Sequence, residues 1–169
     1  MKILRTALFY AVMLSLLAGC GYSLTGRSTP LLQGRSLHLA MFANRTYQPN
    51  IEAEFRKALL AELALRGENI RAEAVADFIL TGELDSASVT TTAYSAADKA
   101  MMYSLTLTAT MQITERQSGR VIWKSADTLK QEYPATADLG LQRNNREAAI
   151  TALCARMAKN IVQKMDQAF

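Results

Sequence analysis

The sequence is poor in the side chains that usually carry metal, redox and acid–base chemistry. Its 169 residues include two cysteines and one histidine. His38 lies in a predicted strand, without a nucleophile or a metal-ligand companion at a telling spacing, so a structural or exposed role is favoured over catalysis. The glycines Gly82 and Gly119 stand alone and do not form a phosphate-binding loop. We therefore expect a protein that is not an enzyme and that holds no metal or cofactor.

Long apolar runs are also missing, and the most apolar segment lies at the N-terminus. Residues 7–17 are apolar except for one serine and follow two basic residues. This run is shorter than the ~20 residues that span a bilayer, and it is typical of a secretory signal. The following Leu17-Ala18-Gly19-Cys20 resembles the processing site of bacterial lipoproteins. The alternative, a short N-terminal membrane anchor, would leave that resemblance unexplained.

This reading divides the chain into three parts: a lipoprotein signal peptide at residues 1–19, a lipidated N-terminus and tether at 20–34, and a single periplasmic domain at 35–169. The resemblance to the lipoprotein processing site implies that Cys20 is lipidated and becomes the first residue of the mature chain. Several acyl chains anchor a protein stably where one does not. Gly21 follows in place of the aspartate that retains enterobacterial lipoproteins at the inner membrane. We therefore expect a lipid anchor on the periplasmic side of the outer membrane.

Charge and the remaining cysteine narrow the class of partner. Without the two basic residues of the signal, 17 basic residues face 15 acidic ones, so bulk charge does not favour a nucleic acid partner. Any attraction to an anionic ligand must come from local clusters. With Cys20 lipidated, Cys154 has no disulfide partner within the chain. A small core residue is a more economical role for it than a reactive thiol.

Hydrophobic periodicity predicts an α+β fold. Residues 101–114 alternate strictly between apolar and polar, which is typical of a half-buried strand with a polar outer face. A hairpin turn at 115–120 and a return strand to Tyr133-Pro134 follow. Shorter strands are expected at 35–41, 69–72 and 78–84. Residues 85–98 and 135–142 lack a sustained period and are expected to be an edge segment or loops.

Two amphipathic helices complete the pattern. The first is expected from about residue 50 to 66 and ends at Gly67. The second is expected from about Asn144 to Met165, with Asn144 or Asn145 as its N-cap. The economical arrangement is a two-layer sandwich in which both helices pack on one face of a mainly antiparallel four-stranded sheet. The other face, rich in threonine and serine, would be left for solvent or a partner.

Several segments together resemble LptE, the family of lipopolysaccharide-assembly lipoproteins. They are the start of the mature chain and four later pieces: Cys20–Arg27, Phe42–Glu52, Ala76–Gly82, Tyr103–Ile113 and Ser118–Trp123. The resemblance implies an outer-membrane lipoprotein that pairs with the β-barrel LptD, plugs its lumen and assists the delivery of lipopolysaccharide to the outer leaflet. A polar sheet face would suit a polar barrel lumen. The alternative is an accessory envelope lipoprotein of another transport or secretion machine.

The same resemblance implies two lipopolysaccharide-binding residues. In the family, basic residues in the loop before the central strand and in the segment before the last helix are implicated in binding. Arg143 lies in Leu139–Asn145, which matches the second place, and Lys99 is the only cation in residues 85–100. Cations at loop ends can approach the phosphates of the lipid. The plainer interpretation is that both are solvated surface charges.

Overall fold

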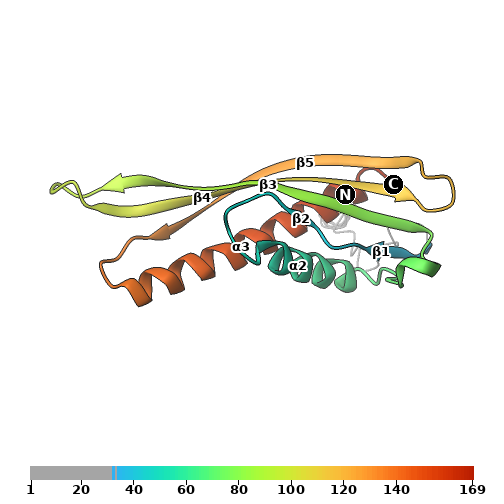
Figure 1. Ribbon diagram of the computed structural model, residues 1–169, viewed down its shortest axis with the longest axis horizontal. Helices are drawn as coiled ribbons and strands as arrows, with labels where there is room; N and C mark the ends of the chain where they lie inside the picture. Colours follow the sequence, from blue (N-terminus) through green and yellow to red (C-terminus); the bar gives the residue numbers. More distant parts are fainter. Residues whose placement is uncertain (1–31, 33) are drawn as a thin grey trace, which may run out of the picture.

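The computed structural model describes residue 32 and residues 34–169, and it confirms the α+β class. Two long helices lie on the same side of a long, twisted sheet (Figure 1). The elements, in chain order, are β1 (Leu37–Leu39), β2 (Ala43–Asn44), α2 (Ile51–Leu65), a 3-10 turn (Glu73–Val75), β3 (Phe78–Tyr94), β4 (Ala100–Glu115), β5 (Val121–Pro134) and α3 (Leu139–Asp166).

The sheet has five strands and is mixed, so the prediction of four strands was wrong. Its order is β1-β3-β4-β5, and β2 also pairs with β3. The long β3-β4 and β4-β5 pairs are antiparallel, whereas β1 and β2 run parallel to β3. The parallel pairs follow from the connection: α2 returns the chain to the start of the sheet, as a crossover helix does between parallel strands. β1 and β2 have three and two residues, so the hydrophobic pattern predicted a single strand at 35–41 and did not reveal β2.

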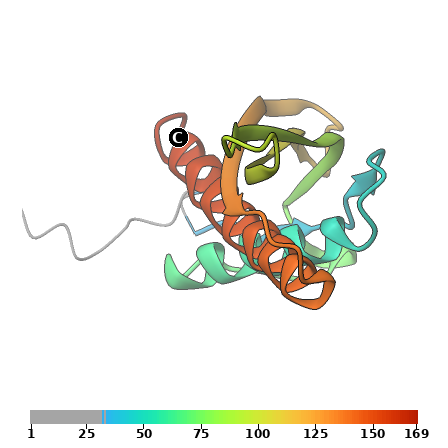
Figure 2. The ribbon, with the colours of Figure 1, turned by 90° about the vertical axis from the view of Figure 1, so that its left-hand side faces the viewer.

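β4 confirms the clearest sequence pattern. Its apolar positions Leu105, Leu107 and Ile113 are at most 1% exposed, and the alternating threonines are partly exposed on the other face. The turn to β5 uses Gly119 at φ 69°, as predicted. Figure 2, which looks along the sheet, shows that the strands coil strongly rather than forming a flat layer. This coiling is the right-handed twist of β-strands accumulated over long strands.

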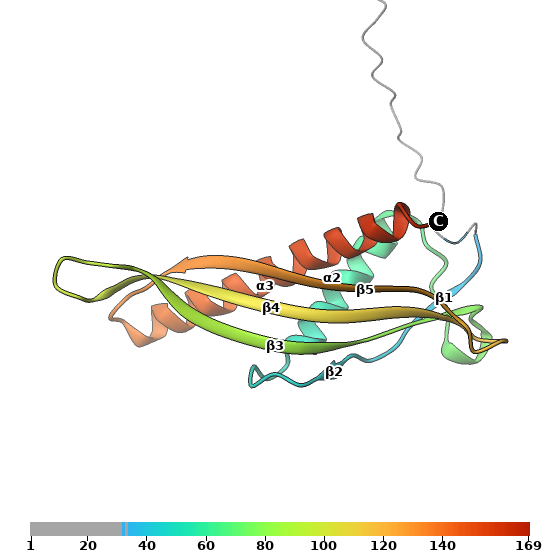
Figure 3. The same cartoon turned by 90° about the horizontal axis from the view of Figure 1, so that it is seen from above.

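β3 is longer than the strand predicted at 78–84, because residues 85–94 continue it, which agrees with the extended-edge alternative and not with a loop. They pair with β4 as far as Tyr94–Ala100. The register shifts between Leu84 and Ser86, so Asp85 forms a bulge. The bulge moves the alternation by one residue and hides the strand from a period-2 search. The part of this hairpin at residues 88–104, here called the distal hairpin, forms one end of the molecule (Figures 1 and 3).

The first helix agrees with its prediction. α2 buries Ile51, Phe55, Leu59 and Leu63, which are spaced four residues apart and form one stripe. Gly67 at φ 72° ends the helical region. Phe55 meets the ring of Phe42 edge-on, with 5.1 Å between the ring centroids.

The second helix begins earlier than predicted. Its N-cap is Asp138, whose carboxylate accepts a 2.7 Å hydrogen bond from the backbone N–H of Leu141. Asn144 and Asn145 therefore lie inside the helix and are not its caps. Because no side chain from 139 to 148 is buried, this segment carried no apolar period from which to predict it. From Ala149 to Met165 the helix buries the predicted stripe, including Leu153 and Met157.

The core lies between the helices and the inner face of the sheet. The buried cluster joins α2 and α3 to the apolar positions of β3 and β4. Arg66 and Asp166 form an ion pair between the C-terminal ends of the two helices. Two smaller expectations were wrong near the start of the domain. The strand predicted at 35–41 covers only Leu37–Leu39, and residues 69–72 form only a single bridge, between Ile70 and Leu37.

Candidate functional site

Lys99 lies in the tight turn at the tip of the distal hairpin. Its backbone carbonyl accepts a 2.8 Å hydrogen bond from the N–H of Ser95, and the Ser95 hydroxyl accepts from the Lys99 N–H at 3.2 Å. Asp98, beside it, has φ 54°, a left-handed conformation that aspartate tolerates in turns. The turn thus holds an exposed ammonium group at the extreme end of the sheet.

Arg143 lies on α3 rather than in a segment before it, which corrects the sequence prediction. It is exposed, in the second turn of the helix. A cation near a helix N-terminus opposes the helix dipole, so it has little stabilising role there. Within residues 34–169, no hydrogen bond or ion pair is assigned to the Arg143 side chain, and its guanidinium remains accessible to an anion.

The structure brings these two cations to the same end of the molecule. Residues 135–145 tie the start of α3 to the base of the distal hairpin. The N–H of Ala135 donates to the carbonyl of Met101 at 2.9 Å, and the amide of Asn145 donates to the carbonyl of Pro134 at 3.2 Å. In Figures 1 and 3 the start of α3 and the hairpin tip accordingly lie at the same end.

Exposed apolar side chains surround this end, and the sequence analysis missed them. They are Tyr94 (63% exposed), Met101 (54%), Leu139 (83%) and Leu141 (52%). They were overlooked because 85–98 and 135–142 were interpreted as an edge segment or loops, and because Met101 was expected on the buried face of the strand 101–114. The usable signal was Asp138, a strong N-cap residue directly before the leucines. Apolar groups beside accessible cations form an amphipathic surface, which matches the chemistry of a phosphorylated lipid.

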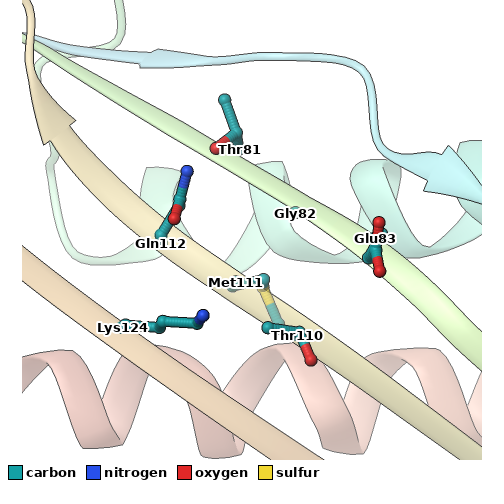
Figure 4. Close-up of a pocket in the computed structure, with 7 residues that line it drawn as sticks. All are labelled: Thr81, Gly82, Glu83, Thr110, Met111, Gln112 and Lys124. Carbon is teal, nitrogen blue, oxygen red and sulfur yellow. The ribbon is translucent and has the colours of Figure 1, made fainter. Parts of the chain in front are cut away.

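The outer face of the sheet is polar, as predicted, and it carries a shallow hollow of about 290 Å³. Figure 4 shows its side chains on β3, β4 and β5, with the helices behind the strands. The lining side chains include Thr81, Glu83, Thr110, Gln112 and Lys124. Hydrogen bonds already engage part of this face: Thr110 donates to Asp85 at 2.9 Å. The face offers neutral and charged polar groups.

Cys154 and His38, which the sequence analysis also considered, lie in surroundings that favour structural roles. Cys154 is fully buried in α3, and burial raises the pKa of its thiol to about 12, with the carboxylate of Glu54 adding to the effect. The ring of His38 lies 3.1 Å from the carbonyl of Arg71 and 3.9 Å from the carboxylate of Glu73. In the part of the chain that the structure describes, no group of three or more metal-binding side chains forms a site.

A second polar cluster fastens β1 to the start of β3. One carboxylate oxygen of Asp77 accepts from the N–H of Ser36 at 2.8 Å and from its hydroxyl at 2.7 Å. These hydrogen bonds, the backbone one first, lower the pKa of the Asp77 carboxyl. The guanidinium of Arg35 lies 4.1 Å from the ring centroid of Phe78. This cluster lies at the end opposite the distal hairpin and has a structural role.

Comparison with known families identifies the chain's relatives. The model of the family described as "LptE: Lipopolysaccharide-assembly" matches residues 34–165. The chain belongs to the LptE family. The sequence resemblance to LptE is thereby confirmed, and with it the interpretation as a lipoprotein of lipopolysaccharide assembly. No curated protein sequence matches the chain significantly.

Solved structures share the fold of this LptE-family chain. The rare lipoprotein B of Shewanella oneidensis is 16% identical, with a TM-score of 0.56 over 78% of this chain and 94% of that one. A minor lipoprotein of Acinetobacter baumannii is 15% identical, with a TM-score of 0.50 over 79% and 92%. A Chlamydia trachomatis protein is 12% identical, with a TM-score of 0.55 over 79% and 97%. At these identities the likeness concerns the fold alone.

The predicted signal peptide and the processing site that ends in Cys20 lie outside the described residues, so lipidation stays a prediction. Among residues 34–169, neither α2 nor α3 is apolar enough over a sufficient length to cross a membrane.

Proposed function

We propose that this LptE-family chain is an outer-membrane lipoprotein that binds lipopolysaccharide and pairs with an LptD-like β-barrel, whose lumen it plugs. In this role the chain acts by binding and positioning rather than by catalysis. One observation carries the proposal: within a fold that the LptE model matches over residues 34–165, one end gathers accessible cations and exposed apolar side chains.

The distal end suits a lipid that carries phosphates. Lys99 and Arg143 can each donate charge-assisted hydrogen bonds to a phosphate oxygen, and arginine can do so through two N–H groups at once. Tyr94, Met101 and Leu139 offer apolar area beside them. Lipopolysaccharide combines phosphorylated sugars with acyl chains, so it uses both kinds of group.

The polar sheet face supports the barrel pairing. The lumens of transmembrane barrels are polar, and the outward face of β3, β4 and β5 presents threonines, a glutamine and a lysine (Figure 4). The opposite face is closed by the helices. A domain of this kind can therefore meet a polar lumen without burying unpaired apolar surface.

The proposed anchor is tested separately from the lipopolysaccharide site. The first described residues, near β1, lie at the end of the molecule opposite the distal hairpin (Figure 3). Cys20→Ala should yield a precursor that is neither acylated nor retained in the outer membrane. Acylated, outer-membrane-bound Cys20→Ala protein would contradict the proposed anchor.

Charge reversal tests the lipopolysaccharide site. Lys99→Glu with Arg143→Glu should weaken binding of purified lipopolysaccharide at least about tenfold, because each charged hydrogen bond contributes ~1.5–3 kcal/mol. The loss should be larger at low salt, where repulsion is screened least. Arg120→Glu with Lys159→Glu makes the same charge change elsewhere on the surface and serves as the control. Binding by the Lys99/Arg143 variant equal to that of the control would remove these residues from the site.

Co-purification tests the barrel pairing. The full-length tagged chain, extracted with detergent from its own outer membrane, should carry a large β-barrel of the LptD family in stoichiometric amount. Recovery of a different membrane complex without that barrel would instead favour an accessory lipoprotein of another transport or secretion machine.

A further inference from the structure

The loop between β2 and α2, residues 45–50, presents an unusually exposed aromatic side chain. Tyr47 is 102% exposed, so its side chain is as accessible to solvent as that of a tyrosine in an extended peptide. In Figure 2 this loop projects from one side of the molecule. A tyrosine held in water gains nothing for folding, and tyrosines are enriched among the residues that dominate protein interfaces.

The loop is nevertheless built rigidly, with Asn44 as its centre. The Asn44 amide donates to the carbonyl of Gln48 at 2.9 Å and to the carboxylate of Glu52 at 2.7 Å. Its side-chain oxygen accepts from the N–H of Thr46 at 2.9 Å and from its hydroxyl at 2.8 Å. The Thr46 hydroxyl also accepts from the N–H of Gln48 at 3.1 Å. These bonds surround Tyr47 on both sides and fix the backbone that carries it.

Contacts from two other elements hold the loop against the domain. Arg45 forms a 2.9 Å ion pair with Glu83 of β3. Arg146 of α3 donates a 2.6 Å hydrogen bond to the side-chain oxygen of Gln48. A loop fixed in this way is already ordered before binding, so binding through Tyr47 would cost little further conformational entropy.

A hollow of about 380 Å³ lies directly beside the loop. Pro49, Ile51 and Ile150 supply its apolar lining, and Glu54 and Glu147 supply two carboxylates. Glu54 has a cation, Lys57, at 3.7 Å, whereas Glu147 is exposed. A hollow whose lining is partly apolar and partly polar, with two carboxylates, accommodates a lysine or arginine, whose stem is apolar and whose head is positive.

We propose that Tyr47 and this adjoining hollow form a docking surface for a protein segment that inserts a basic side chain into the hollow and receives the tyrosine ring in an apolar pocket. The occupant is a segment of the LptD-like barrel, so the inference rests on the proposed function for the partner's identity. The surface is built by the β2–α2 loop and by residues 147–151 of α3, and it adjoins the lipopolysaccharide-facing end, because Arg143 lies one helical turn before Glu147.

Photo-crosslinking in living cells tests the location. Benzoylphenylalanine in place of Tyr47, in the full-length lipoprotein, should crosslink to the barrel. The same probe in place of Leu65, which is 80% exposed on the last turn of α2, is the matched control and should crosslink much less. Equal crosslinking at the two positions, or a Tyr47 crosslink to lipid or to another protein, would overturn the inference.

Binding measurements test the chemistry. Tyr47→Ala should weaken association with the purified barrel about thirtyfold, the fold-change typical of losing a central interface aromatic. Leu65→Ala should leave association unchanged, and Tyr47→Phe should retain most of it. Glu147→Lys should weaken association further at low salt, because it opposes the basic side chain of the partner. Unchanged affinity for both Tyr47→Ala and Glu147→Lys would overturn the inference.

Failure of this inference differs from failure of the proposed function. If the wild-type chain co-purifies with the barrel while Tyr47 neither crosslinks to it nor contributes affinity, the docking surface is wrong and the pairing stands. If no barrel co-purifies at all, the proposed pairing itself is wrong, and the docking surface with it.

Discussion

Gly82→Ala should destabilise the domain, because the structure leaves no room for a methyl group there. Gly82 lies in the first third of β3, opposite Met111. A Cβ at this position would lie 2.6 Å from the Met111 Cγ, 2.6 Å from the Thr110 carbonyl oxygen and 3.0 Å from a ring carbon of Phe42. Carbon contacts normally begin near 3.5 Å.

The magnitude depends on which neighbours can move. The Met111 side chain is flexible and can rotate, but the Thr110 oxygen belongs to the backbone of the central strand. Relief therefore requires β3 and β4 to shift apart where they are most closely paired. Overpacking of this kind costs ~1–3 kcal/mol, and the backbone contact favours the upper part of that range. Such a loss is a large fraction of the ~5–15 kcal/mol that stabilises a typical domain.

Urea unfolding of the purified domain measures this effect. The midpoint should fall without a change in slope, since the surface exposed on unfolding is nearly the same. Thr81→Ala, on the outer face of the same strand, should change stability by no more than ~0.5 kcal/mol. Adding Met111→Ala to Gly82→Ala should cost less than the sum of the single changes, because it removes one of the clashes. A Gly82→Ala protein as stable as wild type would refute this reasoning.

Three further predictions concern the buried core, the Cys154 thiol and the Asp77 carboxyl. Leu107→Ala, at a fully buried site, should cost ~2–5 kcal/mol in thermal or urea unfolding, whereas Thr108→Ala on the outer face should cost far less; equal losses would contradict the alternation. At pH 8 the Cys154 peptide should be alkylated roughly a thousandfold more slowly in the folded chain than in urea, because its pKa is about 12 when buried; equal rates would show that the site is open. The lowered pKa of Asp77 means that its bonds to Ser36 contribute stability above the ordinary pKa of 3.8 and lose it as pH falls through the folded-state pKa. In Asp77→Asn the free energy of unfolding should depend less on pH below about 3.8. An unchanged dependence on pH would show that Asp77 does not contribute in this way.

Elements that the sequence predicted well are those with a strong local period. α2 begins and ends within a residue of its expected bounds, since an apolar stripe and Gly67 mark it. The β4–β5 hairpin is equally legible, because β4 alternates strictly and Gly119 permits a positive φ in the turn. In both cases residues close in the chain decide the structure.

Elements that were missed depend on partners distant in the chain. Residues 85–94 become strand because β4 pairs with them, and the bulge at Asp85 breaks the alternation that would have shown it. The first turns of α3 have no buried face, so only the Asp138 cap indicated them. β2 has only two residues and carries no period, whereas β1 lies within the strand predicted at 35–41.

By itself the sequence determined the class of fold, the two buried helical stripes, the central hairpin and the family, because these depend on local patterns that survive without knowledge of contacts. It also selected Lys99 and Arg143 through the family resemblance. Only the tertiary structure decided that both cations lie at one end, beside exposed Tyr94 and Leu139, because a hairpin and a helix far apart in sequence meet there. The tertiary structure alone showed that Tyr47 is fully exposed on a hydrogen-bonded loop, since the exposure of a side chain depends on every element that could have covered it.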